Sequence, residues 1–327
     1  MQETPAMVKA ETKGKELSLG RRMMDILRIS YTITFVLASI TGVALALTVR
    51  QEWLIAALIP IDVFFLALFV NFSNDYFDHK SGVDKLRFEN RDQFEQAREV
   101  LTEKFYWSGN AFDNGLITKR QGKVVMAVIA TLAVLFAIPI VMYGGWMVIV
   151  LGAIGFLLSY FYTAPPINLG ARGLGEVDVA VSFAFMSFFS YFVIVQDFSW
   201  ETVLVSICVG LAVGLVRIVD EMTGLDAHKK AGERNLCVIY GLEKVTRMVE
   251  VLLVLLYVLI GLLLVFDLTY IVVFLTLPAA VRTVRYLRDR NDELRLVRPV
   301  PEILKVAVGT EILVVIALIA RTVLTFA

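Results

Sequence analysis

Long apolar runs recur along the whole chain of 327 residues and constrain its fold more than any other feature. A run of about 18 or more apolar residues can cross the hydrocarbon core of a bilayer as a helix. The chain is 58% hydrophobic, against roughly 45–50% in an average soluble domain, so one soluble core could not bury the excess. The sequence therefore predicts an all-α polytopic membrane protein, a bundle of nine transmembrane helices, and excludes soluble, fibrous and disordered classes. The nine predicted helices cover residues 28–49, 53–73, 123–143, 145–163, 176–196, 201–219, 246–266, 268–287 and 303–325.

Charge is distributed unevenly between the connections of these helices, although 31 basic and 31 acidic residues balance overall. The zero net charge argues for neither nucleic acid nor an acidic partner. Basic residues concentrate in the N-terminal tail and in four connections, 74–122, 164–175, 220–245 and 288–302. Because Lys and Arg near helix ends stay on the cytoplasmic side, we expect an integral protein of the cell membrane, with its N-terminus cytoplasmic and its C-terminus outside.

The domain organisation follows from these segments. Residues 1–26 form a predicted cytoplasmic tail, and residues 27–327 form one nine-helix transmembrane domain with long cytoplasmic loops at 74–122 and 220–245. Residues 87–107 place apolar side chains among charges, which is compatible with an amphipathic helix on the membrane surface or with a solvated helix over the site. Two cysteines are too few for a disulfide framework and lack the spacing of a metal site.

The first candidate site lies where the second apolar segment ends. Four polar residues there are spaced so that they share one face of a helix: Asn71, Asn74, Asp75 and Asp78. Gly82 is expected to break the helix, which lets Asp84 fold back toward them. Carboxylate and amide oxygens suit Mg²⁺, which proteins usually hold with one or two carboxylates together with substrate phosphates. An acidic cap on a solvated loop is the alternative interpretation.

A second acidic cluster follows the sixth apolar segment, on the same predicted side of the membrane. Asp220 and Asp226 lie six residues apart and would not share the face of a straight helix, so they can act together only if the backbone unwinds at Gly224. Basic residues accompany both clusters, and such a pairing is typical of a diphosphate held by metal ions and cations. Metal bridges remove the repulsion between carboxylate and phosphate oxygens and stabilise diphosphate as a leaving group.

These motifs resemble those of the UbiA superfamily of intramembrane prenyltransferases, which join an isoprenoid diphosphate to an acceptor, often aromatic. Residues 74–84 are similar to the first aspartate-rich motif of the branch that prenylates 1,4-dihydroxy-2-naphthoate on the way to menaquinone. Residues 162–176 are similar to the inner loop of that branch. The resemblance extends over all nine predicted helices and implies an Mg²⁺-dependent prenyltransferase with a central cavity open to the cytoplasmic side.

The chain departs from the family pattern at two places. The second motif aligns with residues 220–236, but its two aspartates fall on Gly224 and His228. The arginine–proline signature of the quinone branches corresponds here only to residues 110–118. The first departure concerns the second metal site, and the second departure concerns the identity of the acceptor.

From the clusters and the resemblance we expect three sets of site residues. The predicted catalytic residues are Asp75, Asp78, Asp220 and Asp226. The predicted Mg²⁺ ligands are Asn74, Asp78, Asp84, Asp220 and Asp226. The predicted substrate-binding residues are Asn71, Lys80, Tyr162, Arg172, His228, Lys230 and Arg234. The expected partners are a polyprenyl diphosphate, an aromatic acceptor and the lipid bilayer.

Several alternatives remain open from the sequence. The same fold could prenylate a glycerol-phosphate lipid or another redox carrier, or a relative without catalysis could bind prenyl lipids. A transporter is the alternative from another class, but carriers place ligand groups near the membrane midplane in broken helices, whereas the acids here gather at helix ends. Three carboxylates inside apolar segments, Asp62, Glu250 and Glu311, are candidates for binding the acceptor or a proton.

Overall fold

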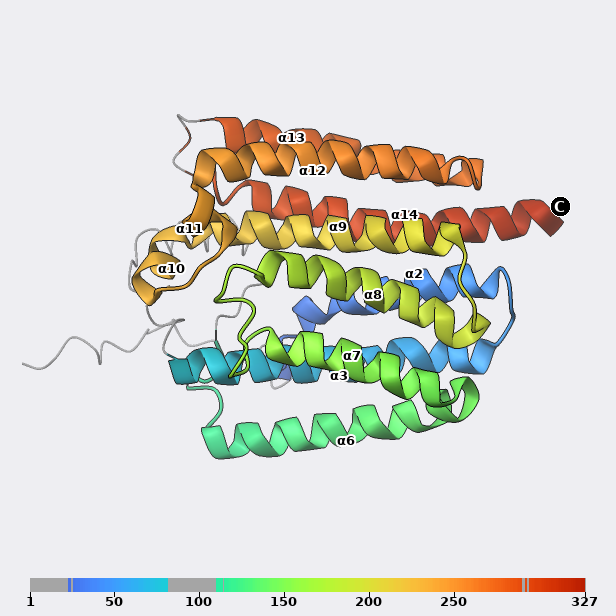
Figure 1. The fold of residues 1–327 in the computed structure, drawn as a ribbon, viewed down its shortest axis with the longest axis horizontal. Helices are drawn as coiled ribbons and strands as arrows, with labels where there is room; N and C mark the ends of the chain where they lie inside the picture. The colour runs from blue at the N-terminus through green and yellow to red at the C-terminus, as the bar shows by residue number, and fades with distance from the viewer. Residues whose placement is uncertain are drawn as a thin grey trace, which may run out of the picture.

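The computed structural model describes residues 23–81 except 25, and residues 110–326 except 114, 290, 291 and 293. Within these ranges every regular element is helical, and the long helices run side by side in one bundle (Figure 1). The elements are α2 Ile29–Leu47, α3 Trp53–Ser81, α6 Lys119–Gly144, α7 Trp146–Phe161, α8 Gly175–Val195, α9 Trp200–Thr223, α10 Leu225–Ala231, α11 Leu236–Tyr240, α12 Leu242–Leu263, η2 Leu268–Thr276, α13 Leu277–Arg288 and α14 Pro299–Phe326.

The helices begin and end within four residues of the predicted apolar segments, except that α3 continues eight residues past the predicted end at 73, to Ser81. Among the described residues, 7 helices are long and apolar enough to cross a membrane, and two shorter apolar helices, Thr32–Leu47 and Trp146–Phe161, accompany them. The predicted segment 268–287 begins as the 3-10 helix η2 and continues as α13, which has Pro278 in its first turn. Proline has no N–H to donate, so it is tolerated at such a helix start.

The connections differ between the two ends of the bundle (Figure 1). We call the end that holds residues 162–174, 224–241 and 294–298 the loop end; α3 ends there and α6 begins there. The opposite end, which we call the turn end, holds the short connections α2–α3, α6–α7, α8–α9 and α12–η2. Both predicted acidic clusters therefore lie at the loop end, whereas α14 ends at the turn end.

Small residues let the central helices approach one another closely. A side-chain carbon added to Gly210 on α9 would lie 2.2 Å from the carbonyl oxygen of Ala180 on α8. One added to Gly42 on α2 would lie 2.0 Å from a carbonyl oxygen of α8. Helices in membranes commonly associate through such small residues, because apolar side chains gain little by leaving lipid for protein. The close contact of α8 with α9 positions Glu176 and Arg217, which the loop-end halves of these helices carry.

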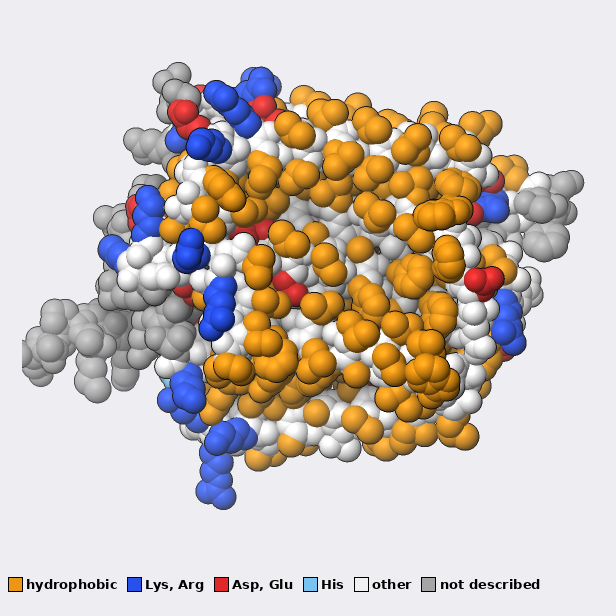
Figure 2. Space-filling model, viewed as in Figure 1, with side chains coloured by type: hydrophobic (Ala, Val, Ile, Leu, Met, Phe, Trp, Pro, Cys, Tyr) orange, Lys and Arg blue, Asp and Glu red, His pale blue; other side chains and the backbone are white. Residues whose placement is uncertain are grey.

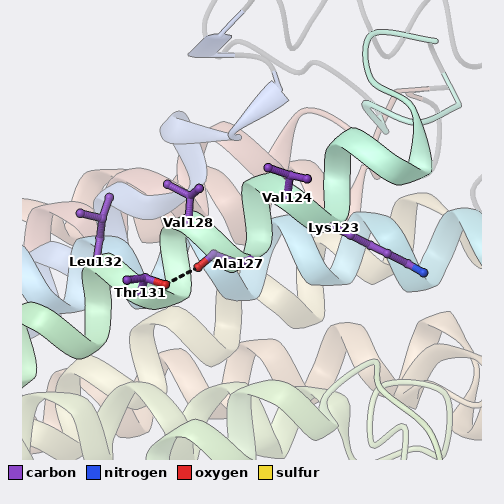
Figure 3. A pocket seen from close by; sticks show the side chains of 6 residues that line it. All are labelled: Lys123, Val124, Ala127, Val128, Thr131 and Leu132. Atoms are coloured by element: carbon purple, nitrogen blue, oxygen red, sulfur yellow. Dashed lines mark hydrogen bonds between the residues drawn. The ribbon is translucent and has the colours of Figure 1, made fainter.

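The surface of the bundle is banded (Figure 2). Hydrophobic side chains cover its middle, whereas most Lys and Arg on the visible face lie at the ends, the larger group at the loop end. A groove of about 460 Å³ runs along α6 (Figure 3) and is lined by Lys123, Val124, Ala127, Val128, Thr131 and Leu132. The Thr131 hydroxyl donates to the Ala127 carbonyl at 2.8 Å, so the groove is mainly apolar and unsuited to a diphosphate.

Helical structure extends into both of the long predicted loops. α3 continues to Ser81, and Thr118 caps α6 through reciprocal bonds with Gln121, so both ends of the predicted loop 74–122 are helical. The predicted loop 220–245 contains the short helices α10 and α11. The break predicted at Gly82, the predicted surface helix 87–107 and most of the predicted tail 1–26 lie outside the described residues.

Candidate active site

The loop-end half of α3 carries the first predicted cluster. Its Asp75 side chain is buried and forms an ion pair with Arg28, which precedes α2. The backbone N–H of Ala111 also donates to Asp75 at 3.4 Å, and the Asn110 side chain donates to the Asp75 carbonyl oxygen at 2.8 Å. A buried carboxylate needs such partners to be tolerated. These contacts commit Asp75 to holding α2, α3 and the segment before α6 together.

The other polar residues of α3 approach the inner loop 162–174. The side-chain oxygen of Asn74 accepts a hydrogen bond of 2.5 Å from the Thr163 hydroxyl. Asp78 is half-buried one turn later, and it is close enough to Tyr162 to act on it electrostatically. Asn71 is buried one turn earlier on the same face of α3. The structure therefore brings this part of the first cluster to the start of the inner loop.

Tyr162 connects this cluster to α9. The guanidinium of Arg217 on α9 lies 5.4 Å from the centroid of the Tyr162 ring, which is within the range of a cation–π interaction. Burial raises the pKa of the Tyr162 hydroxyl, and the positive charge of Arg217 opposes this only in part. The hydroxyl thus stays protonated and can donate a hydrogen bond. Through Tyr162 and Thr163, one loop touches the polar ends of both α9 and α3.

The end of α9 is built around the buried carboxylate of Glu221. Arg217, one turn earlier, forms an ion pair with one of its oxygens. The other oxygen lies 2.8 Å from Nε2 of His228 and accepts a hydrogen bond of 2.7 Å from the Asn235 side chain. Nδ1 of His228 lies 2.5 Å from the Glu233 carboxylate. Both ring nitrogens of His228, a predicted substrate-binding residue, thus lie against carboxylates, and the ring ties α10 to α9.

The helix is interrupted at Gly224, between Asp220 and Asp226. α9 ends immediately before this residue and α10 begins immediately after it. Asp220, on the last turn of α9, keeps 38% of its side chain exposed and lies 3.6 Å from Arg217. Asp226 is exposed in the first turn of α10. The backbone break that Gly224 permits is therefore present between the two acids.

The segment after α10 is bound to the inner loop and to α8. The backbone N–H of Arg234 donates to the carbonyl of Ala171 at 3.0 Å. The N–H of Leu236 donates to the buried carboxylate of Glu176 on α8 at 2.8 Å. Arg172 and Arg234 consequently lie side by side in a short parallel bridge. Two predicted phosphate-binding residues, 62 positions apart in the sequence, are thereby neighbours.

The predicted cationic ligands of the diphosphate are exposed at the loop end: Lys80, Arg172, Lys230 and Arg234. Lys80 lies in the last turn of α3, and Lys230 lies in the last turn of α10. Arg172 donates to the carbonyl of Pro166 at 2.8 Å. Because a carbonyl carries no net charge, this bond orients the guanidinium without neutralising it.

The donor atoms at these helix ends are hard oxygens. Among the described residues, no three side chains of His, Cys, Asp or Glu are grouped so that they could hold a metal ion. An Mg²⁺ ion held by one or two carboxylates together with substrate phosphates needs no such group. The carboxylates of Asp78, Asp220 and Asp226 and the amide oxygen of Asn74 therefore fit this ion chemically. The remaining predicted ligand, Asp84, lies outside the described residues.

Several buried polar atoms have no hydrogen-bond partner in the part of the chain that the structure describes. Those of this region include Asn71 Nδ2, Tyr162 Oη, Glu176 Oε2 and Arg217 Nε. Such atoms are rare in folded proteins, and a ligand or water commonly satisfies them. Of the carboxylates predicted inside apolar segments, Glu250 pairs with Arg288, whereas one oxygen of Asp62 and both oxygens of Glu311 are buried without a described partner.

Sequence reasoning assigned no role to four residues that organise this region: Arg28, Glu176, Arg217 and Asn235. Two of them carried a usable signal, since Arg28 and Arg217 are charges at the edges of apolar segments, and such charges usually have partners. Asn235 caps α11 by accepting from a backbone N–H, and asparagine is a preferred N-cap residue. The pairing of Glu176 with residue 236 is long-range and left no local signal.

Comparison with known proteins gives distant but extensive similarity. The chain is 20% identical to the 1,4-dihydroxy-2-naphthoate octaprenyltransferase of Bacillus subtilis (strain 168), over 71% of this chain and 70% of that protein. It is 22% identical to the 2-carboxy-1,4-naphthoquinone phytyltransferase of Synechocystis sp. (strain ATCC 27184 / PCC 6803 / Kazusa), over 80% and 81% of the two chains.

Solved structures share the fold. A digeranylgeranylglyceryl phosphate synthase superposes with a TM-score of 0.63 at 16% identity, over 91% of this chain and 98% of that one. A UbiA homolog from Archaeoglobus fulgidus, solved with DMAPP and Mg²⁺, superposes with a TM-score of 0.59 at 15% identity, over 90% and 99%. Residues 109–298, more than half of the chain, match the profile of the UbiA prenyltransferase family. The chain therefore belongs to the UbiA prenyltransferase family.

Proposed function

We propose that this prenyltransferase transfers a polyprenyl group from a polyprenyl diphosphate to 1,4-dihydroxy-2-naphthoate in menaquinone biosynthesis, and that the transfer requires Mg²⁺. The observation that carries the proposal is the pair of contacts made by one loop, Thr163 with Asn74 and Tyr162 with Arg217. These contacts bring the oxygen-rich ends of α3 and α9 to one place, at the end of the bundle where basic side chains are exposed. A diphosphate requires both features, because cations offset its charge while carboxylates hold the bridging ion.

The comparisons support the finer parts of this proposal. Both curated relatives are named for transfer to a naphthoid compound, 1,4-dihydroxy-2-naphthoate in one and 2-carboxy-1,4-naphthoquinone in the other. The Archaeoglobus fulgidus homolog is described as bound to DMAPP and Mg²⁺. The acceptor and the metal of this chain are proposed by analogy with these proteins and by the donor set described above.

We assign the residues at the loop end to three tasks. Asn74, Asp78 and Asp84 would hold Mg²⁺ on the α3 side, and Asp220 and Asp226 would hold it on the α9 side. When bound, the ion would offset the negative charge of the diphosphate and stabilise it as a leaving group.

The cationic and hydroxyl groups would bind the phosphate oxygens directly. Arg172 and Arg234 suit this task, because a guanidinium presents a planar fork of donors to phosphate. Lys80 and Lys230 add positive charge beside them. The protonated Tyr162 hydroxyl, which has no described partner, is a further donor. Asp75 and His228 would act by holding the neighbouring elements in position through their own ion pairs.

We propose that all nine apolar helices cross the membrane around a central cavity open to the cytoplasm, with the N-terminus cytoplasmic and the C-terminus outside. The concentration of exposed basic residues at the loop end supports this orientation. Basic residues at the turn end are few among the described residues, and two of them are neutralised. Arg50 lies 3.3 Å from Glu52, and Arg321 lies 2.8 Å from Glu201.

The test is release of diphosphate and formation of a prenylated product by the purified protein in detergent, with geranylgeranyl diphosphate and 1,4-dihydroxy-2-naphthoate. We expect turnover with Mg²⁺ and none after chelation. Replacing Asp78 with alanine should lower turnover on the order of a hundredfold or more, as the loss of a main electrostatic contact to a transition state does. The matched control is Asp197→Ala, which removes an exposed carboxylate from the α8–α9 connection at the turn end.

Each alternative function predicts a different result in this assay. Diphosphate release without a prenylated naphthoid would retain the reaction class and direct the search to glycerol-phosphate lipids or other redox carriers. Binding of the diphosphate without release would support a relative that binds prenyl lipids without catalysis. Full activity of the Asp78→Ala variant would refute the assignment of the metal site on α3.

A further inference from the structure

A second pocket lies at the loop end, between the first turns of α12 and the last turn of α13. Its volume is about 250 Å³, and none of its lining residues belongs to the candidate active site. Three arginines, two glutamates, three leucines and one threonine line it: Arg247, Arg288, Arg295, Glu243, Glu250, Leu242, Leu287, Leu296 and Thr246.

The charges of this pocket are only partly compensated. Arg288 donates from Nε and Nη2 to the two oxygens of Glu250, each at 2.6 Å, so this bidentate pair is fixed and neutral as a unit. Glu243 is engaged in an interaction of its own. Arg247 and Arg295, by contrast, have no side-chain ion pair with any residue that the structure describes. The pocket therefore presents two guanidinium groups that an anion could bind.

The pocket lies at a boundary between apolar and basic surface on α12 and α13. Beyond Glu250, α12 exposes a row of apolar side chains that leads away from the pocket: Val251, Val254, Leu255 and Val258. α13 has the same arrangement relative to the loop end. Val281 is exposed in the middle of the helix, and Arg285 is exposed near its loop end. In a membrane-spanning helix, such a boundary between apolar and basic surface lies at the level of the lipid headgroups.

We propose that this pocket binds one anionic phospholipid, whose phosphate is held by Arg247 and Arg295 and whose acyl chain lies along the apolar row of α12. Guanidinium groups match phosphate oxygens geometrically, and basic pockets between helices on the cytoplasmic side of membranes bind acidic lipid headgroups. The leucines of the lining favour a lipid over inorganic phosphate, because they gain from contact with the glycerol and acyl carbons. The inference depends on the membrane placement of α12 and not on the acceptor of the enzyme.

The test titrates short-chain phosphatidylglycerol into the purified protein in neutral detergent and follows the midpoint of thermal unfolding. The double variant Arg247→Gln/Arg295→Gln is compared with Lys119→Gln/Arg120→Gln, which removes two exposed charges from the first turn of α6, also at the loop end. We expect phosphatidylglycerol to stabilise the wild type and the control. The pocket variant should need a roughly thirtyfold higher concentration, from the loss of two basic residues beside a lipid phosphate.

Two further measurements test whether the bound phosphate belongs to a lipid and whether the contact with it is electrostatic. Phosphatidylcholine and inorganic phosphate should not reproduce the stabilisation; equal stabilisation by inorganic phosphate would overturn the lipid as occupant. In the wild type, added NaCl should weaken the effect of phosphatidylglycerol, because salt screens exposed charges. An unchanged response of the pocket variant, or a salt-independent response of the wild type, would overturn the proposal. Prenyl transfer in detergent should be unaffected in the pocket variant, so this test and the test of the proposed function fail independently.

Discussion

The polar ends of α3 and α9 use their acids in parallel ways but with partners from different parts of the chain. On α3 the buried Asp75 is neutralised by Arg28, 47 residues away, in front of a different helix. On α9 the buried Glu221 is neutralised by Arg217 from the preceding turn and is contacted by His228 from α10. Each end thus has one buried acid that is fully engaged in holding elements together.

Each end also has acids that are more accessible. Asp78 on α3 and Asp220 on α9 are half-buried, and Asp226 in the first turn of α10 is exposed. We propose from this comparison that the buried acids position helices and that the accessible acids bind the ligand. The comparison also predicts which helix end is more sensitive to the loss of its partner. Loss of Arg28 should disrupt helix packing around α3, whereas loss of His228 should free only the short helices α10 and α11.

The largest effect is expected from Arg28→Met. This change leaves the Asp75 carboxylate buried without its partner, and breaking a buried pair in this way costs about 3–5 kcal/mol. A marked fall in the midpoint of thermal unfolding in detergent would record it. The double variant Arg28→Met/Asp75→Leu removes both charges and should recover most of the stability, since an apolar replacement of a buried pair is often neutral.

The double variant also separates two roles for Asp75. If Asp75 only positions α3, recovery of stability should bring recovery of prenyl transfer. A stable but inactive double variant would instead give the carboxylate a direct part in the reaction. A single Arg28→Met variant as stable as the wild type would contradict the structural role of the pair.

An intermediate effect is expected from His228→Gln, at the position where the family motif has an aspartate. The change weakens the contacts with Glu221 and Glu233, and hydrogen bonds to charged groups contribute about 1.5–3 kcal/mol. Because the histidine ties α10 to α9, the loss should be local. Hydrogen exchange should accelerate in residues 225–240, while α12 keeps its protection.

Kinetics distinguish this positioning role from direct contact with substrate. A displaced α10 should raise KM for the diphosphate, because Lys230 and Arg234 follow His228 in the chain, with a smaller effect on kcat. Asp197→Ala at the turn end serves as the matched control. A loss of turnover without any change in hydrogen exchange would mean that His228 acts on the substrate itself.

The sequence was sufficient for the apolar helices and for the ends at which the acids gather. A helix break at Gly224 was recognised as the condition under which Asp220 and Asp226, six residues apart, could act together, and the structure has a break there. What the sequence did not reveal were long-range partners such as Arg28 with Asp75 or Glu176 with the N–H of Leu236. Periodicity identifies which face of a helix is polar, but it does not specify which distant group that face meets. The 3-10 geometry of η2 was missed for a related reason, since its composition is that of any apolar helix.

The smallest effect is expected from Thr163→Val, which is also the sharpest test of how the polar ends of α3 and α9 are linked. The change is nearly isosteric and removes only the hydroxyl that donates to Asn74, a loss of about 1 kcal/mol in stability. Thr131→Val is the control, because its hydroxyl bonds only to the carbonyl of its own helix at Ala127. If the inner loop holds Asn74 toward the ligand, Thr163→Val should lower kcat/KM several-fold while Thr131→Val leaves it unchanged. Equal activity of the two variants would mean that the ends of α3 and α9 are held together by the buried acids alone, and that the loop between them contributes through Tyr162 and Arg172 only.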